Sequence, residues 1–170
     1  MRVWSPIISV VLGFAVSSGA FADVVHVATR YGTLSIEELP NRVNFEGRVF
    51  FKGHRLHPDV HGNNALTVAR IFRLTNADAV LFEDRGGVGC PYLWYIVSVA
   101  PLGVASTREF GSCGPLLDWA QKGQAIVIHT TGFCGPLEPL SERERASKEI
   151  HTFSYRRGVV AEIGAHAPCQ

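Results

Sequence analysis

A short histidine-rich segment contains residue types that bind metals. Within eight positions it places His54, His57, Asp59 and His61. Imidazole nitrogens and carboxylate oxygens are ligands of Zn²⁺ and Cu²⁺, so these four side chains could hold either ion. Pro58 interrupts any helix through the segment, and the helical His-Glu-x-x-His pattern of zinc proteases is absent. A polar loop between strands is the simpler interpretation, and a Zn²⁺ or Cu²⁺ site is the alternative.

A glycine-rich segment follows further along the chain. It contains Arg85, Gly86, Gly87 and Gly89, and its backbone N–H groups could face a carboxylate or a phosphate. The Lys-Ser/Thr ending of a nucleotide-binding P-loop is missing. Glycines also allow the backbone of a partner to come close. The sequence therefore indicates a candidate binding loop at these four residues.

Residues for catalysis do not form a recognisable motif. Gly-x-Ser-x-Gly is absent. Glu83 and Asp84 are neighbours in a strand, so their side chains point to opposite faces and do not predict an acid–base pair. Glu109 is interpreted as a surface charge, and His129 as a half-buried residue of a strand. A non-catalytic protein is expected, with a hydrolase assembled from distant residues as an alternative.

The first 22 residues have the pattern of a signal peptide. Arg2 is their only charged residue, residues 7–16 form an apolar run, and the sequence Ala-Phe-Ala at 20–22 is a typical cleavage site. The run is shorter than the roughly 20 residues that span a bilayer. We expect residues 23–170 to be a single exported domain, periplasmic or secreted, without stable membrane insertion after cleavage.

The charge of the mature chain excludes some partners. The whole chain has 16 Lys and Arg against 15 Asp and Glu, and the predicted cleavage removes one of the basic residues. Nucleic-acid binding and electrostatic attachment to a membrane surface both need an excess of positive charge. We therefore expect no nucleic-acid partner.

Four cysteines in the exported part predict two disulfides, because an even number in an oxidising compartment is typical of a disulfide framework. A symmetric hairpin with its turn at 100–103 places Cys90 opposite Cys113. Elimination then pairs Cys134 with Cys169. Free buried thiols are the alternative.

Most of the chain has the character of short strands. Segments rich in β-branched and aromatic residues recur about every 10 to 15 residues between turn-forming residues. Residues 92–99 are apolar on both faces, which predicts a central strand covered on both sides. Arg157 and Gly158 predict a two-residue hairpin turn. We expect an all-β fold, a single antiparallel sandwich or barrel of about 8–10 short strands.

Helical signals are few. Ser141 and Glu144 have the spacing of a capping box, which predicts one short helix near 141–149. Residues 115–121 are expected to form at most one further helical turn.

Two stretches carry a family resemblance. Residues 86–95 begin with Gly-Gly-Val-Gly-Cys-Pro, and residues 109–113 read Glu-Phe-Gly-Ser-Cys. Together they resemble small exported proteins of Gram-negative bacteria in which a G-x-G-C-P strand is followed by an F-G-x-C return. The resemblance covers about 30 residues and implies a disulfide hairpin; it implies no activity and no functional residues.

Rigid sheets that carry variable loops suit binding, because the scaffold fixes the loops in space. We therefore expect an exported, non-catalytic β-domain that binds another periplasmic or secreted protein through its loops, as an inhibitor or a toxin-immunity protein. The alternatives are a small-ligand or metal-binding periplasmic protein and a hydrolase.

Overall fold

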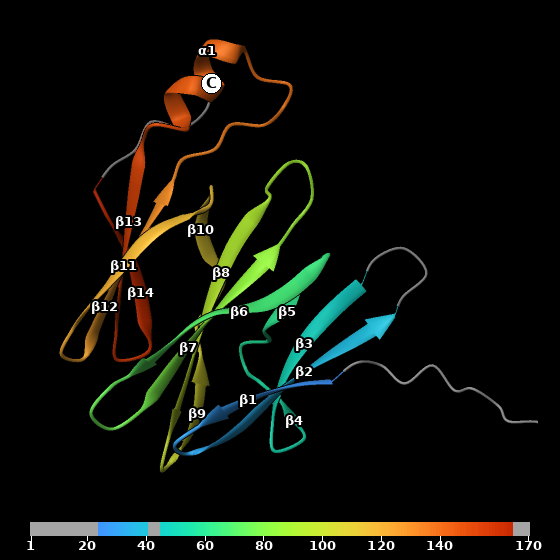
Figure 1. The fold of residues 1–170 in the computed structure, drawn as a ribbon, viewed down its shortest axis with the longest axis vertical. Coiled ribbons are helices and arrows are strands. Elements are labelled where there is room, and N and C mark those ends of the chain that lie inside the picture. The colour runs from blue at the N-terminus through green and yellow to red at the C-terminus, as the bar shows by residue number, and fades with distance from the viewer. Residues whose placement is uncertain (1–23, 41–44, 165–170) are drawn as a thin grey trace, which may run out of the picture.

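The computed structural model describes residues 24–40 and 45–164, which form three antiparallel sheets and one helix (Figure 1). The first sheet contains β1 (Val24–Thr29), β2 (Gly32–Pro40), β3 (Phe45–Phe51), β4 (His54–Arg55) and β5 (His61–Gly62). The second contains β6 (Ala65–Arg73), β7 (Asp78–Arg85), β8 (Tyr92–Ala100), β9 (Gly103–Ser106) and β10 (Phe110–Cys113). The third contains β11 (Leu116–Lys122), β12 (Ala125–Thr131), β13 (Ile150–Arg156) and β14 (Val159–Ile163), and α1 (Leu140–Ala146) lies between β12 and β13. The expected all-β class is confirmed, and the described part of the chain holds fourteen strands.

The second sheet is the middle layer, and each of its faces is covered by another sheet. Its central strands β7 and β8 alternate between two cores. Val80 and Tyr95 pack with residues of the first sheet, whereas Leu81 and Trp94 pack with residues of the third. A strand that is buried on both faces must be apolar on both, which is what residues 92–99 predict. The expectation of a central strand there is confirmed.

The disulfide that the structure describes joins the segment before β8 to the end of β10, beyond the β8–β9 hairpin. Val97 pairs with Ser106, the register that a symmetric turn at 100–103 requires. The register then slips, so that Phe110 pairs with Trp94 and Cys113 pairs with Tyr92. Cys90 and Cys113 are bonded, with their Cα atoms 4.7 Å apart. The predicted pairing is therefore confirmed, but the two cysteines do not face each other in an unbroken ladder.

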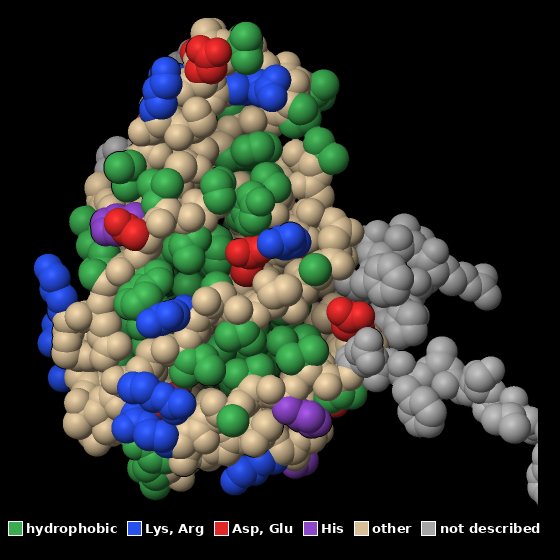
Figure 2. Space-filling model, in the orientation of Figure 1, with side chains coloured by type: hydrophobic (Ala, Val, Ile, Leu, Met, Phe, Trp, Pro, Cys, Tyr) green, Lys and Arg blue, Asp and Glu red, His purple; other side chains and the backbone are tan. Residues whose placement is uncertain are grey.

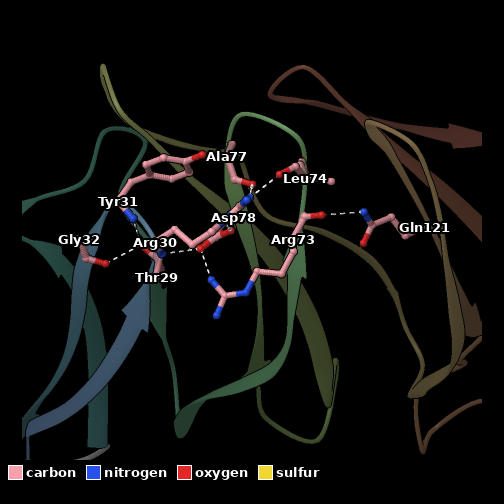
Figure 3. Close-up of polar contacts among 9 residues, drawn as sticks. All are labelled: Thr29, Arg30, Tyr31, Gly32, Arg73, Leu74, Ala77, Asp78 and Gln121. Carbon is pink, nitrogen blue, oxygen red and sulfur yellow. Dashed lines mark hydrogen bonds and ion pairs between the residues drawn. The ribbon is translucent and has the colours of Figure 1, made fainter.

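The outer sheets are joined to the middle one by specific side chains. Asp78, at the start of β7, accepts hydrogen bonds from the backbone and the guanidinium of Arg30 in the β1–β2 turn, and it pairs with Arg73 of β6 (Figure 3). On the other side, Trp119 of β11 packs edge-on against Phe72, with 5.2 Å between ring centroids. Hydrophobic side chains also lie together on the surface where β6 and β11 are in contact (Figure 2).

Two local predictions are corrected by the structure. Residues 116–122 form β11 instead of a helical turn, because pairing with β12 satisfies their backbone. The helix begins at Leu140 with Pro139 as its N-cap, and no side chain caps it. Ser141 therefore lies inside the first turn, and the predicted capping box does not form. The turn at Arg157 and Gly158 is confirmed, with both residues at positive φ, as a type I′ hairpin requires.

Some predictions fall on residues outside the described ranges. The predicted signal peptide, residues 1–22, and Cys169 both lie there. The pairing of Cys134 with Cys169 therefore stays a prediction. Within the ranges that the structure describes, no helix has the length and the hydropathy needed to cross a membrane.

Candidate functional site

An open hollow of about 480 Å³ lies beside the loop that connects β7 to β8. Four loop residues line it, at positions 86, 87, 89 and 90. The rest of its wall includes His61, Asn63, Asp84, Leu93 and Glu109. The structure thus brings the predicted glycine loop together with three titratable side chains from separate segments. We call this site the acidic hollow.

The loop itself is held at both ends. Gly86 N–H donates to the carbonyl of Pro91 at 3.0 Å, and Cys90 N–H donates to that of Gly87 at 3.2 Å. Asn64 Nδ2 donates to the Gly86 carbonyl at 2.8 Å. The disulfide fixes Cys90 to β10. These contacts leave Val88 at the tip, with 76% of its surface exposed.

The glycines of the loop differ in what the fold demands of them. A Cβ atom at position 86 would lie 2.1 Å from the carbonyl oxygen of Cys90, so the fold itself requires glycine there. A Cβ atom at Gly87 or Gly89 would meet nothing within 4 Å, and neither residue has the positive φ that favours glycine. Intramolecular packing therefore explains Gly86 but neither of the other two.

Asp84 is the buried acid of the site, with 4% of its surface exposed. It lies on the face of β7 that also carries Val80 and Phe82, and its Oδ1 accepts a hydrogen bond from Asn63 N–H at 2.8 Å. Burial raises the pKa of its carboxyl, and the adjacent Glu109 carboxyl raises it further. These effects outweigh the Asn63 hydrogen bond and the positive charge of His61, which lower it.

Glu109 reaches the site from the segment between β9 and β10. Its Oε1 accepts a hydrogen bond from the hydroxyl of Tyr95 at 3.0 Å, and its side chain lines the same hollow as that of Asp84. Burial, and then the charge of Glu109, raise the pKa of Tyr95, so this hydroxyl stays protonated and remains a donor. The site therefore contains two carboxyls in one hollow, and the charge of Glu109 disfavours ionisation of Asp84.

Arg85 does not belong to the hollow. Its Nε donates to Glu83 Oε1 at 2.7 Å, and its side chain is exposed. The loop also fails to present a run of free N–H groups, because those of Gly86 and Cys90 are bonded internally. Two carboxyls line the neighbouring wall, so the site is unsuited to the carboxylate or phosphate that the sequence suggested.

The histidine segment does not form one cluster. His54 pairs with Phe51 at one end of β3, whereas His61 pairs with Arg48, three residues away along the same strand. Asp59 Oδ2 accepts from Arg55 Nη2 at 2.5 Å and lies 4.0 Å from His61 Nδ1. Over residues 24–40 and 45–164, no three His, Cys, Asp or Glu side chains are placed to share a metal ion.

The placement of Asp84 and Glu109 in one hollow was not predicted from the sequence. One signal was present: Asp84 has the same parity as Val80 and Phe82, so an alternating strand turns it toward the core. The position of Glu109 had no such signal.

Comparison of the chain with protein-family models, with curated proteins and with solved structures finds no match.

The fold and the site together define a class of protein. It is a disulfide-bonded, all-β protein with three antiparallel layers. A disulfide is typical of oxidising compartments, which indicates a location outside the cytoplasm.

Proposed function

We propose that this chain is an exported protein, periplasmic or secreted, that binds another protein through the 86–90 loop. Gly87 and Gly89 carry the proposal. The packing of the chain gives no reason for glycine at either position, whereas a partner backbone that lies against the loop would give one. Val88, exposed between them, would be the side chain that the partner buries.

The shape and the charge of this region suggest the kind of partner. A narrow, anchored loop tip can enter a cleft with little loss of conformational freedom, because it is already ordered. An inhibitor or a toxin-immunity protein would bind in this way. Asp84 and Glu109 beside the loop favour a partner surface with basic side chains around the cleft.

Bulky substitutions in the loop test the proposal. Gly87→Trp and Gly89→Trp add side chains where the fold has open space, so both variants should fold. Leu102→Trp is the matched control, because Leu102 is fully exposed in the turn at the other end of β8. Partners are identified by cross-linking in an envelope extract, and their affinity is then measured with purified components.

We expect both loop variants to bind the purified partner at least ~10-fold more weakly than the parent, a loss of about 1.4 kcal/mol. The Leu102→Trp control should bind with the affinity of the parent, and all three variants should keep the parent's melting temperature. Wild-type affinity in both loop variants would exclude the loop as the binding surface.

A hydrolase is the second candidate, and the convergence of Asp84, Glu109 and His61 in a hollow favours it. Two carboxyls that line one hollow can supply an acid and a base to a bound substrate. The test is a panel of peptide, ester and glycoside substrates. Activity that is lost in both Asp84→Asn and Glu109→Gln but kept in Gly87→Trp would favour this alternative over protein binding.

A further inference from the structure

A second hollow, of about 460 Å³, lies between the middle sheet and the third sheet. It is formed where the β6–β7, β11–β12 and β13–β14 turns come together at one end of the molecule (Figure 1). The 86–90 loop follows the opposite end of β7, so this hollow is separate from the proposed protein-binding site. We call it the Arg157 hollow, after the one charged side chain among the described residues that line it.

Tyr155 of β13 forms the inner wall of this hollow. Its side chain is 3% exposed and packs in the core between the two sheets. Its hydroxyl has no hydrogen-bond partner among the residues that the structure describes, and it is not a fully buried atom, so it opens on the hollow that the side chain lines. Phenylalanine would fill the same space in the core. Packing therefore explains the ring of Tyr155 but not its hydroxyl.

Arg157 lines the same hollow from the two-residue turn between β13 and β14. Its φ of 52° is in the left-handed region, where Asn and Gly are favoured and a long side chain is strained. The side chain is exposed and makes no ion pair with any residue in the described part of the chain. The turn and the packing thus give no reason for arginine at this position, whereas binding of a ligand by the guanidinium would give one.

The charges around the hollow favour an anion. Over the described ranges, no acidic residue lines it. Asp78 follows the lining residue Ala77 in the chain, but its carboxyl is buried and is paired with both Arg30 and Arg73 (Figure 3). One carboxylate against two arginines leaves the β6–β7 turn with a net positive charge, and Arg157 adds to it.

We propose that the Arg157 hollow binds a small organic carboxylate that also carries a hydroxyl or carbonyl group. The planar guanidinium of Arg157 matches a carboxylate, to which it donates two parallel hydrogen bonds. Tyr155, two residues earlier and on the same face of the chain, donates its hydroxyl hydrogen to the second oxygen group of the ligand.

The rest of the wall suits a ligand of this kind. Asn76, Ser98 and Gln124 supply further polar groups, and Leu74 and Ala105 supply apolar contacts. The volume is in the lower half of the range of small-molecule sites. The hollow therefore fits a hydroxy acid or a sugar acid. This inference goes beyond the proposed protein binding and does not depend on it.

Titrations of the purified mature protein, followed in ¹⁵N–¹H NMR spectra, test the inference. The probes are lactate, citrate and glucuronate, and glucose is the neutral counterpart of glucuronate. We expect at least one of the carboxylates to shift the amide signals of residues 76–77, 124 and 157–158 in a saturable way. Glucose should bind at least ~10-fold more weakly than glucuronate, because it has no group for the guanidinium.

Two variants separate binding from stability. Arg157→Asn removes the guanidinium and introduces a residue that the left-handed turn favours, and Tyr155→Phe removes only the hydroxyl. Both should keep or raise the melting temperature of the parent. Arg157→Asn should weaken binding of the carboxylate at least ~10-fold, and Tyr155→Phe at least ~3-fold. Arg143→Gln, at an exposed arginine of α1, is the matched control and should bind as the parent does.

The inference would be overturned if none of the three carboxylates gave a saturable shift at these residues. Parent affinity in Arg157→Asn, or equal affinity for glucose and glucuronate, would also overturn it. If Tyr155→Phe fails to fold, Arg157→Asn decides the point alone, since its change lies in an exposed turn.

Discussion

Asp78 joins two sheets through Arg30. The carboxyl is fully buried at the start of β7, and it accepts from Arg30 N at 2.6 Å and from Arg30 Nε at 2.8 Å. The same guanidinium also donates to the Ala77 carbonyl at 2.9 Å, so one arginine of the β1–β2 turn binds the whole β6–β7 turn (Figure 3). Arg73 adds a second positive charge. This relationship fixes the first sheet on the middle sheet at one end of their shared core.

Asp78→Asn should lower the free energy of unfolding by about 2 kcal/mol at neutral pH. A charged hydrogen bond contributes about 1.5–3 kcal/mol, and the partly exposed arginines reduce the effect. Urea denaturation of the parent and the variant measures the difference. A control at an exposed acid, Glu144→Gln, should change the free energy by less than about 0.5 kcal/mol.

The contribution of Asp78 should also depend on pH. Burial alone would raise the pKa of this carboxyl, but the hydrogen bonds from Arg30 and the charges of Arg73 and Arg30 outweigh burial and lower it below 3.8. A lowered pKa in the folded state stabilises the protein above 3.8, and this stabilisation is lost as the pH falls through the folded value. The difference between the parent and Asp78→Asn should therefore shrink in acid, and a constant difference would contradict this account.

Gly114 should tolerate no side chain. A Cβ atom there would lie 1.9 Å from the carbonyl oxygen of Thr131, where the chain passes from the middle sheet to the third. Gly114→Ala should lower the free energy of unfolding by about 2 kcal/mol or more, because the backbone at position 114 or at Thr131 must move to admit the methyl group. Gly135 is a matched control, since it also lies in a Cys-Gly-Pro-Leu sequence but has nothing within 4 Å of its Cβ position. Equal melting temperatures for the two alanine variants would show that the passage is not tightly packed.

Loss of the disulfide at Cys90 should destabilise the protein and release one end of the 86–90 loop. Cys90→Ser should lower the free energy of unfolding by ~2 to 4 kcal/mol, the usual range for a native disulfide. Denaturation of the oxidised parent, the variant and the double variant Cys90→Ser/Cys113→Ser measures this loss. A single variant as stable as the parent would show that the bond does not contribute to stability.

Cys134 should be bonded to Cys169. Cys134 is buried and follows β12. The last residue of β12, Thr131, pairs with Ile150 at one end of the third sheet, and β14 ends with Ile163 at the same end. Cys134 therefore follows a strand that ends at the same end of the third sheet as β14, which is the basis of this prediction. Peptide mapping without reduction should recover the two cysteines in one linked peptide, whereas alkylation of Cys169 in the unreduced protein would contradict the pairing.

The β8–β9 hairpin shows how far sequence reasoning reaches in this fold. Local residue types predicted its turn, its first register and the pairing of Cys90 with Cys113, because a two-residue turn fixes the strands beside it. They also predicted that β8 is buried on both faces. The strand at residues 116–122 was not predictable in the same way, since only its pairing with β12 decides its conformation.

The sequence by itself determined the all-β class, the central strand and the disulfide hairpin, because these depend on residue type and on neighbours along the chain. Only the tertiary structure decided the site. In an unbroken register Glu109 would face Trp94 and the third sheet. The slip before Phe110 instead puts Phe110 opposite Trp94 and turns Glu109 toward Tyr95 and the hollow that Asp84 also lines. A shift of one residue exchanges the two faces of a strand, and the packing of three sheets selects which register is stable.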